Sequence, residues 1–194
     1  MVKQLVFATN NKHKLQELRE IVGGEFEILS LADIGCAEDI VEDGNTFKDN
    51  ALIKARYVKD HYGYDCFADD SGLEIDALDG APGVYSARFA GEDCDSRRNI
   101  EKVLILMGDC MNRKARFVTV FALILNNKIH FFEGEVQGTI LKECRGDDGF
   151  GYDPIFLPEG STLTFAEMSH EVKNSISHRG KATAKLVEFL KSML

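Results

Sequence analysis

The sequence predicts an α/β protein in which helices flank a mixed central sheet. Two observations lead to this prediction. In the first part of the chain, short apolar runs typical of buried strands alternate with segments whose apolar residues recur at helical spacing. Two long strand-like runs then flank Asn126-Asn127, a two-residue loop suited to joining antiparallel strands. Alternating strands and helices with a central hairpin indicate both parallel and antiparallel neighbours.

The first third of the chain is expected to begin with a strand, loop, helix unit. Residues 5–8 form a short buried strand, and LQELREIV forms a helix because its apolar residues share one face. A second short strand covers residues 26–29. Thr46 and Asp49 have the spacing of a capping box, which predicts that a helix begins there.

The rest of the chain is expected to supply most of the sheet and two further helices. The elements are strands at residues 66–68, 73–78, 116–125, 128–135 and around 154–156, and helices at residues 96–107 and 179–193. The first of these strands is predicted to end at the adjacent acids Asp69 and Asp70. The pair Asn126-Asn127 is predicted to form the hairpin turn because asparagine tolerates positive φ.

Length and composition predict one soluble domain over residues 1–194. The chain is 44% hydrophobic and contains no internal repeat, low-complexity tract or Pro/Gly-rich linker. No segment approaches the roughly 20 apolar residues that span a bilayer, and MVKQLVFATNN lacks the pattern of a signal peptide. We therefore expect a cytoplasmic protein with no membrane partner.

The five cysteines are scattered along the chain and contain no Cys-x-x-Cys pair. This spacing does not suit a disulfide framework or a zinc site. It favours reduced thiols, and we expect most of them to be small core residues.

The formal net charge of −9 argues against a nonspecific nucleic-acid-binding protein, because neutralising phosphates requires a basic face. A small polyanion such as a nucleotide remains compatible with this charge. A few lysines and arginines together with a divalent cation would hold it, and the cation itself requires carboxylates.

The stretch ATNNKHK, residues 8–14, follows a strand and precedes a helix. Such a turn presents free backbone N–H groups at the positive end of the helix dipole, and Lys12 and Lys14 add charge, so it is a candidate phosphate site. The alternative is an ordinary asparagine-capped helix with solvated lysines. The loop is not a Walker motif, because Gly-x-x-x-x-Gly-Lys-Ser/Thr occurs nowhere in the chain.

The double acid in FADDSG is a candidate metal site. Successive side chains of a strand point to opposite faces, so only one of Asp69 and Asp70 faces a given cleft while the other binds backbone or solvent. Glu42, in VEDGNTF, is expected to join that acid. Mg²⁺ prefers one or two carboxylates together with phosphate oxygens. The alternative is a surface turn in which an aspartate caps a helix or a turn.

The stretch SHRGKA, residues 177–182, is a candidate anion site at the start of the last helix. Ser177 is expected to be the N-cap, which places His178 and Arg179 at the positive end of the helix. Lys173 lies shortly before them and is expected to reach the same phosphate. The alternative is a capped terminal helix with an exposed arginine, which requires Ser177 alone.

The stretch DDGFGYDPIF, residues 147–156, is a candidate base-binding loop. Two glycines flank Phe150 and Tyr-Asp-Pro follows, which predicts a stiff loop that carries an aromatic ring over open backbone. Such a ring stacks a flat base, an interaction worth about 1 to 3 kcal/mol per base in nucleic-acid systems. The alternative is a loop aromatic that packs on the core.

The chain resembles the inosine/xanthosine triphosphate pyrophosphatase family nearly from end to end. Its motifs appear in the order FATNNKHKLQEL, VEDGNTFKDNALIKAR, FADDSGLEIDALDGAPGVYSARFAG, GFGYDPIF and ISHRGKA. The resemblance implies hydrolysis of ITP, dITP or XTP to the monophosphate and pyrophosphate with Mg²⁺, by an enzyme that is typically a homodimer. It also implies an elongated mixed α/β fold with a cleft between two lobes.

The resemblance further implies a role for individual residues. Asp70 would accept the proton of the attacking water and, with Glu42, would bind the metal. The implied substrate-binding residues are Thr9, Asn10, Asn11, Lys12, His13, Lys14, Lys54, Ser71, Phe150, Gly151, Tyr152, Asp153, Lys173, His178 and Arg179. One departure is Asn10, where most bacterial relatives have glycine, and we expect the turn to survive because asparagine tolerates left-handed backbone.

Three other functions remain open. A sibling pyrophosphatase acting on dTTP, UTP or modified pyrimidine nucleotides would have similar triphosphate machinery. A non-catalytic nucleotide sensor would bind ITP tightly without turnover. A HAD-type phosphatase would require Asp-x-Asp at a strand end, which the adjacent Asp69 and Asp70 do not provide.

Overall fold

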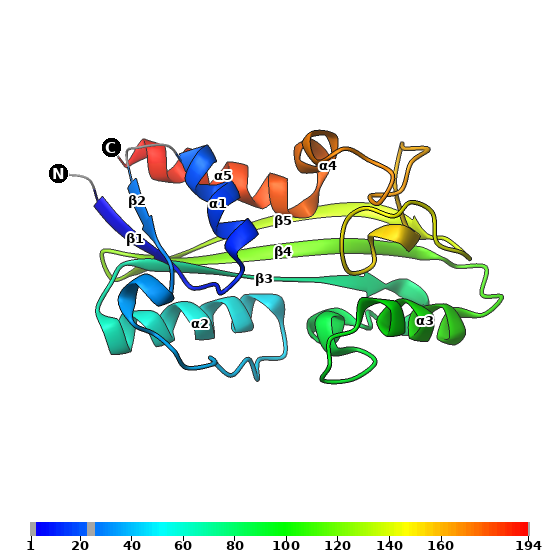
Figure 1. The fold of residues 1–194 in the computed structure, drawn as a ribbon, viewed down its shortest axis with the longest axis horizontal. Helices are drawn as coiled ribbons and strands as arrows, with labels where there is room; N and C mark the ends of the chain where they lie inside the picture. Colours follow the sequence, from blue (N-terminus) through cyan, green and yellow to red (C-terminus); the bar gives the residue numbers. More distant parts are fainter. Residues whose placement is uncertain (1–2, 23–25, 194) are drawn as a thin grey trace. The chain divides into compact units, whose positions relative to one another are not determined.

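The computed structural model describes residues 3–22 and 26–193. Within these residues, six strands form one sheet in the order β2-β1-β3-β4-β5-β6 (Figure 1). The strands are β1 (Lys3–Phe7), β2 (Phe26–Leu29), β3 (Cys66–Ile75), β4 (Lys114–Leu125), β5 (Lys128–Ile140) and β6 (Phe156–Pro158). β1 is parallel to β2 and β3, whereas β5 and β6 are antiparallel, so the predicted mixed sheet is confirmed.

Four of the five α-helices in the described residues lie where the sequence predicts them, and α4 is additional. The helices are α1 (Lys12–Val22), α2 (Phe47–Tyr62), α3 (Ser96–Met107), α4 (His170–Ile176) and α5 (His178–Ser192). The predicted caps are confirmed, because the Thr46 hydroxyl accepts from the N–H of Asp49 and the Ser177 hydroxyl accepts from the N–H of Gly180, both at 3.1 Å. No helix in the described part of the chain is long and apolar enough to cross a bilayer.

Several predicted strand boundaries are wrong, including the end of the strand expected at residues 128–135, since β5 continues to Ile140. β3 does not end at Asp69-Asp70 but continues through both acids to Ile75, because side chains from α1 and α2 bind the two carboxylates. The strand expected at residues 73–78 is therefore the end of β3, followed by a 3-10 helix at Asp76–Leu78. The strand expected around residues 154–156 begins only at Phe156, after a 3-10 turn that contains the proline.

The hairpin between β4 and β5 has the predicted turn. Asn126 and Asn127 have φ angles of 51° and 61°, so both residues adopt the positive φ of a two-residue hairpin loop. This tight connection makes the two longest strands antiparallel neighbours.

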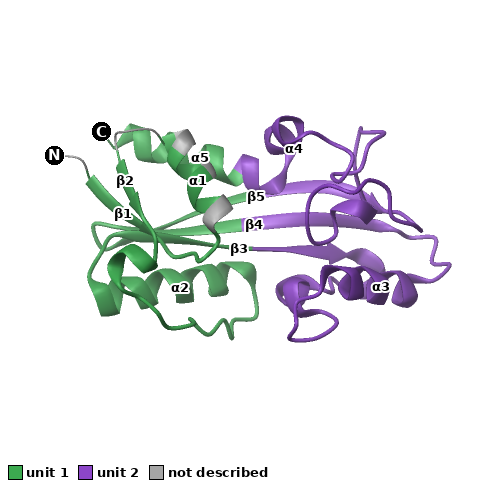
Figure 2. Cartoon of the chain, in the orientation of Figure 1, with its two compact units in different colours: residues 1–70, 120–133, 182–194 green, residues 71–119, 134–181 purple. Residues whose placement is uncertain are grey.

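Contacts divide the chain into two compact units (Figure 2). Unit 1 comprises Met1–Asp70, Val120–Glu133 and Ala182–Leu194, and unit 2 comprises Ser71–Thr119 and Gly134–Lys181. Strands β3, β4 and β5 each contribute residues to both units. This division does not test the prediction of one domain over residues 1–194, which stays a prediction.

In unit 1, α1 and α5 cover one face of the strands and α2 covers the other (Figure 1). Phe7 and Phe67 stack with ring centroids 4.6 Å apart in the cluster that includes α1 and α5. Their neighbours Ala8 and Ala68 belong to the cluster that includes α2. Burying a phenylalanine side chain contributes about 1.5 to 3 kcal/mol, so this packing fixes which face each residue of β3 occupies.

Unit 2 has its own core on the remaining parts of the same strands. Phe117 and Phe156 meet there edge to face, with ring centroids 4.6 Å apart, and Phe165 packs against both. Val103 and Met107 of α3 belong to the same cluster. This core lies beside the motifs that the sequence predicts to bind the base, since Tyr152 is one of its members.

The expectation that most cysteines are core residues is wrong. Cys36 and Cys66 are buried, but Cys94, Cys110 and Cys144 are exposed. All five are free thiols, as predicted. Burial raises the pKa of the Cys66 thiol to about 12, so this group stays protonated at neutral pH.

Candidate active site

The adjacent acids of β3 lie on opposite faces of the strand, as predicted. Asp69 shares the face of Phe67, which packs toward α1, and Asp70 shares the face of Ala68, which packs toward α2. Asp69 is only 3% exposed, whereas Asp70 is half-buried. The helix that each carboxylate faces decides its partner.

Asp69 forms an ion pair with Lys14 of α1, with 2.7 Å between Oδ2 and Nζ. The alternative of a solvated lysine is therefore excluded for Lys14. The sequence did not predict this ion pair for Asp69. A carboxylate this deeply buried requires a charged partner, because an isolated buried ion costs several kcal/mol.

The first loop is organised by Thr9 and Asn11. The Thr9 hydroxyl accepts from the N–H of Asn11, and the Asn11 side-chain oxygen accepts from the N–H of Lys14, both at 3.2 Å. Asn11 thus caps α1. Asn10 is not among the described residues with positive φ, so left-handed backbone is not what preserves this turn.

The same loop borders a hollow. Thr9, Asn10 and Asn11 line a hollow of about 610 Å³ together with residues of α1 and of the segment after β2. The side chains of Lys12 and His13 lie outside the described residues, so their predicted contacts stay predictions.

Asp70 accepts a hydrogen bond from Asn50, which lies in the motif VEDGNTFKDNALIKAR but was given no role by the sequence analysis. Asn50 Nδ2 donates to Asp70 Oδ2 at 3.0 Å, and Asn50 Oδ1 accepts from the backbone N–H of Gly44 at 2.8 Å. Asn50 is only 2% exposed. The sequence signal that would have identified Asn50 is its place one turn after Phe47, on the buried face of the helix. A polar side chain at such a position needs a hydrogen-bond partner.

Glu42 pairs with Lys54, with 2.8 Å between Oε2 and Nζ. Lys54 follows Asn50 by one turn of α2, so the two side chains lie on the same helix face. α2 therefore contacts both predicted metal ligands, Asp70 through Asn50 and Glu42 through Lys54.

The predicted residues of unit 2 begin at Ser71, directly after Asp70 in the chain. The Ser71 and Thr119 hydroxyl oxygens are 2.8 Å apart and share a hydrogen bond. Thr119 is fully buried on β4. The contact therefore holds Ser71, the first residue of unit 2 on β3, against a buried residue of β4.

Phe150 lies close to two cations in unit 2. Its ring centroid is 4.6 Å from Lys173 Nζ and 5.3 Å from Arg179 Cζ, and 60% of the residue is exposed. The alternative of a core-packed Phe150 is therefore excluded. Lys173 also contacts the buried Asp153, with 2.5 Å between Nζ and Oδ2. The structure thus places the Lys173 amine against this loop, and its contact with phosphate stays a prediction.

Tyr152 and Asp153 support the loop from inside. The buried Tyr152 hydroxyl donates to the carbonyl of Ser86 at 2.7 Å, and burial raises the pKa of Tyr152, so the phenol stays protonated. Asp153 accepts from the N–H of Phe150 at 2.8 Å, and Gly151 turns the backbone with a φ of 60°. The core-packed alternative thus holds for Tyr152. Since Ser86 belongs to GAPGVYSAR, that motif serves to anchor the loop.

His178 and Arg179 begin α5. The buried His178 ring stacks on Phe117, with ring centroids 4.7 Å apart. Arg179 Nε is buried and has no hydrogen-bond partner within the described residues. Buried guanidinium N–H groups normally have partners, so this one is an exception within the described residues, and the contact of Arg179 with an anion stays a prediction.

Residues 5–189 match the Ham1 family. The chain belongs to this family. It is 55% identical over 190 residues to the dITP/XTP pyrophosphatase of Porphyromonas gingivalis, covering 97% of this chain and 98% of that protein. The dITP/XTP pyrophosphatase of Flavobacterium psychrophilum is 54% identical, covering 97% of this chain and 100% of that protein. The solved Ham1 protein of Staphylococcus aureus matches with a TM-score of 0.95 at 37% identity, covering 99% and 100% of the two chains. The predicted family is confirmed.

Glu42 and Asp70 are the carboxylates of this Ham1 protein that the sequence predicts to hold Mg²⁺. No group of three or more His, Cys, Asp or Glu residues that could hold a metal gathers anywhere in residues 3–22 and 26–193. Zinc and calcium sites take three or more protein ligands, whereas Mg²⁺ is bound by one or two carboxylates together with phosphates and water. Glu42 and Asp70, tied to the same face of α2, fit that requirement.

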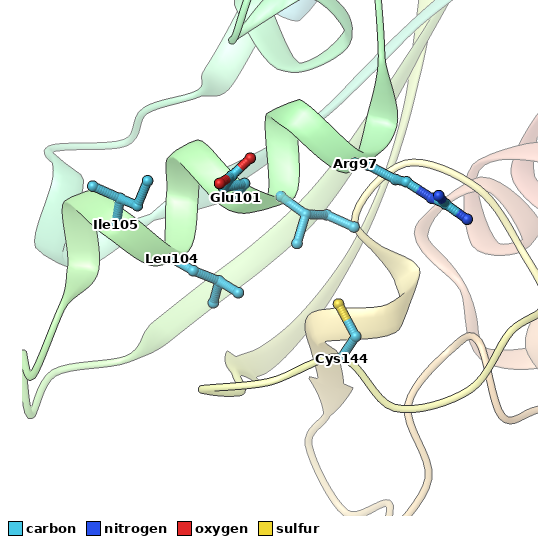
Figure 3. A pocket seen from close by; sticks show the side chains of 6 residues that line it. Arg97, Glu101, Leu104, Ile105 and Cys144 are labelled. Atoms are coloured by element: carbon cyan, nitrogen blue, oxygen red, sulfur yellow. The ribbon is translucent and has the colours of Figure 1, made fainter.

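A further hollow of this Ham1 protein lies in unit 2, where its volume is about 530 Å³. Leu104 of α3 and Cys144 lie on its two sides, and Arg97 and Glu101 complete the polar part of the lining (Figure 3). None of the predicted substrate-binding residues lines this hollow, so it is not part of the candidate active site.

Proposed function

We propose that this Ham1 protein is an enzyme that hydrolyses nonstandard purine nucleoside triphosphates, namely ITP, dITP and XTP, to the monophosphate and pyrophosphate. The near full-length identity to relatives named for this activity carries the proposal. The site geometry supports it, because the two acids of β3 serve different partners. One acid holds a lysine for phosphate, and the other accepts a hydrogen bond from Asn50 of α2, the helix that also pairs with Glu42 through Lys54.

In this proposal unit 1 binds the triphosphate and the metal. Lys14, held by Asp69, binds phosphate oxygens together with the first loop. Glu42 and Asp70 would hold Mg²⁺, which would supply positive charge to offset the negative charge that develops on the phosphates. Lys54, beside Glu42, adds positive charge on the same side of α2.

Asp70 orients a water molecule and accepts its proton. The water oxygen bonds to phosphorus, the anhydride bond between the α- and β-phosphates breaks, and pyrophosphate leaves with the electron pair. A carboxylate of ordinary basicity is a weak base, so the surrounding positive charge must make the water more acidic. The lysines of unit 1 that we propose to supply that charge are Lys12, Lys14 and Lys54.

Unit 2 binds the base on the exposed ring of Phe150. The Phe150→Ala variant is expected to raise KM for dITP about 5- to 150-fold, which corresponds to the roughly 1 to 3 kcal/mol of a stacked base. Inorganic tripolyphosphate has no base, so its inhibition constant is expected to change less than about 3-fold. Steady-state pyrophosphate release measures both constants.

The exposed Leu163 of the same unit offers a matched control, since Leu163→Ala removes a comparable apolar side chain that is not among the predicted substrate-binding residues. It is expected to leave KM and the inhibition constant unchanged. Equal effects of Phe150→Ala on dITP and on tripolyphosphate would show that Phe150 does not stack the base.

Pyrophosphate release from ITP, dITP and XTP, measured beside the eight standard nucleotides, tests the proposed activity. Hypoxanthine and xanthine carry a 6-oxo acceptor where adenine carries an amino donor, so a backbone N–H at that position would discriminate between them by about 10²-fold or more in kcat/KM. Preference for dTTP or UTP would identify the pyrimidine sibling instead. Tight ITP binding without turnover would identify a sensor, and inorganic phosphate as first product a phosphatase.

The proposed enzyme acts in the cytoplasm as a homodimer, without nucleic-acid or membrane partners. The net charge of −9 supports the absence of a nucleic-acid partner. Sedimentation velocity at micromolar concentration tests the dimer, and a single species with the mass of one chain would contradict it.

A further inference from the structure

We propose that Asn50 is a positioning residue for the hydrolysis, because its amide holds the Asp70 carboxylate in the orientation that accepts the proton of water. The inference rests on the proposed function, in which Asp70 is the proton acceptor. Asn50 acts through Asp70 and has no contact with the reacting atoms in this proposal.

Both ends of the Asn50 amide are engaged. The oxygen accepts from the N–H of Gly44 at 2.8 Å, and the nitrogen donates to Asp70 Oδ2 at 3.0 Å. Only the oxygen can accept from a backbone N–H and only the nitrogen can donate to a carboxylate, so the two contacts fix the orientation of the amide. Neither aspartate nor leucine, which have a similar size, supplies both groups.

Gly44 comes unusually close to this amide. A Cβ at Gly44 would lie 2.7 Å from Asn50 Oδ1, which is shorter than side chains tolerate, so only glycine allows the approach. Glu42 lies two residues earlier in the chain and is bound by Lys54, one turn further along α2. The first turns of α2 therefore hold both the segment that carries Glu42 and the carboxylate of Asp70.

This arrangement matters for turnover because the terminal torsion of an aspartate is soft. Rotation of the carboxylate has a broad minimum, so a strand backbone alone does not fix where its oxygens lie. A hydrogen bond from a buried amide on a helix does. Misplacing a catalytic group by about 1 Å can cost about 10²-fold in rate.

The Asn50→Asp variant tests the proposal. It keeps the size of the side chain and an acceptor for Gly44, but it replaces the donor to Asp70 with a carboxylate. We expect kcat for dITP to fall about 10- to 100-fold while KM changes less than about 3-fold. Asn50→Ser, which adds no charge and cannot span both partners, is expected to show the same fall and replaces Asn50→Asp if that variant does not fold.

Asn99 of α3 provides a matched control. It is also a buried asparagine that bridges two partners, accepting from the N–H of Ala90 at 2.6 Å and donating to the carbonyl of Ala87 at 2.8 Å. Asn99→Asp is expected to lower stability in urea unfolding but to leave kcat within about 3-fold of the wild-type value. A merely structural role for Asn50 would give the same pattern as Asn99.

Combining Asn50→Asp with Asp70→Asn exchanges the donor and the acceptor of the hydrogen bond. The exchanged pair is expected to recover much of the stability that Asn50→Asp loses. Its single-turnover rate, with enzyme in excess over dITP, is expected to lie within about 3-fold of that of Asp70→Asn alone, because a residue that acts through Asp70 has nothing left to position.

Two results would overturn the inference. One is a kcat within 3-fold of wild type in both Asn50 variants. The other is that Asn50→Asp lowers the rate of the Asp70→Asn variant by as large a factor as it lowers the rate of the wild type. Failure of the proposed function is distinguishable from either, because the wild-type protein would then release no pyrophosphate from ITP, dITP or XTP. An active wild-type enzyme with unchanged Asn50 variants would reject the role of Asn50 alone.

Discussion

The Asp70→Asn variant is expected to lose turnover of dITP by two or more orders of magnitude while it still binds dITP. The amide matches the carboxylate in size and stays within reach of Asn50, but it cannot accept the proton of water. General-base help contributes about 10² to 10⁴ in rate. Pyrophosphate release at saturating dITP measures the loss, and the measurement covers a range of Mg²⁺ concentrations because Asp70 is also a proposed metal ligand.

The aspartate just before β3 serves as the control for this variant. Asp65 is ion-paired with Lys59 at 2.9 Å, outside the candidate active site. Asp65→Asn also removes one paired carboxylate from unit 1, so it is expected to change stability slightly and kcat not at all. A kcat near the wild-type value in Asp70→Asn would reject Asp70 as the proton acceptor.

The fold was largely predictable because most of its signals are local. Helix α3 has the predicted bounds, and the hairpin turn needs only two residues that tolerate positive φ. The predicted end of the strand at Asp69-Asp70 was wrong because distant contacts outweighed a local signal, the repulsion between adjacent acids. The side chains that bind the two carboxylates are Lys14 and Asn50, which are 55 and 20 residues away in the chain.

For the candidate active site, the sequence predicted residue types better than partnerships. Alternation along a strand was enough to place the two acids on opposite faces. It could not show that Lys14 would bind Asp69, or that Lys173 would bind Asp153, because the partner of a long flexible side chain depends on tertiary packing. Asn50 escaped notice because a polar residue in a helix is usually solvated, and only its burial shows otherwise.

Lys14→Met is expected to lower the free energy of unfolding by about 3 kcal/mol, because it removes the charged partner of a buried carboxylate. The Lys14 side chain is 22% exposed, so the loss should lie at the low end of the range for buried pairs. Adding Asp69→Leu removes the second charge and is expected to recover most of this stability. Urea unfolding of the two variants measures the difference.

Substrate binding separates the two roles of this ion pair. If Lys14 binds phosphate, KM for dITP is expected to rise about 10- to 150-fold in both variants, the equivalent of a charged hydrogen bond of about 1.5 to 3 kcal/mol. Lys59→Met is the control, since Lys59 and Asp65 are each 23% exposed and their pair is worth at most about 1 kcal/mol. If the double variant recovered both the stability and the KM of the wild type, Lys14 would have only a structural role. If Lys14→Met lowered the free energy of unfolding no more than Lys59→Met does, the buried pair would not be what holds β3 in place at the double acid.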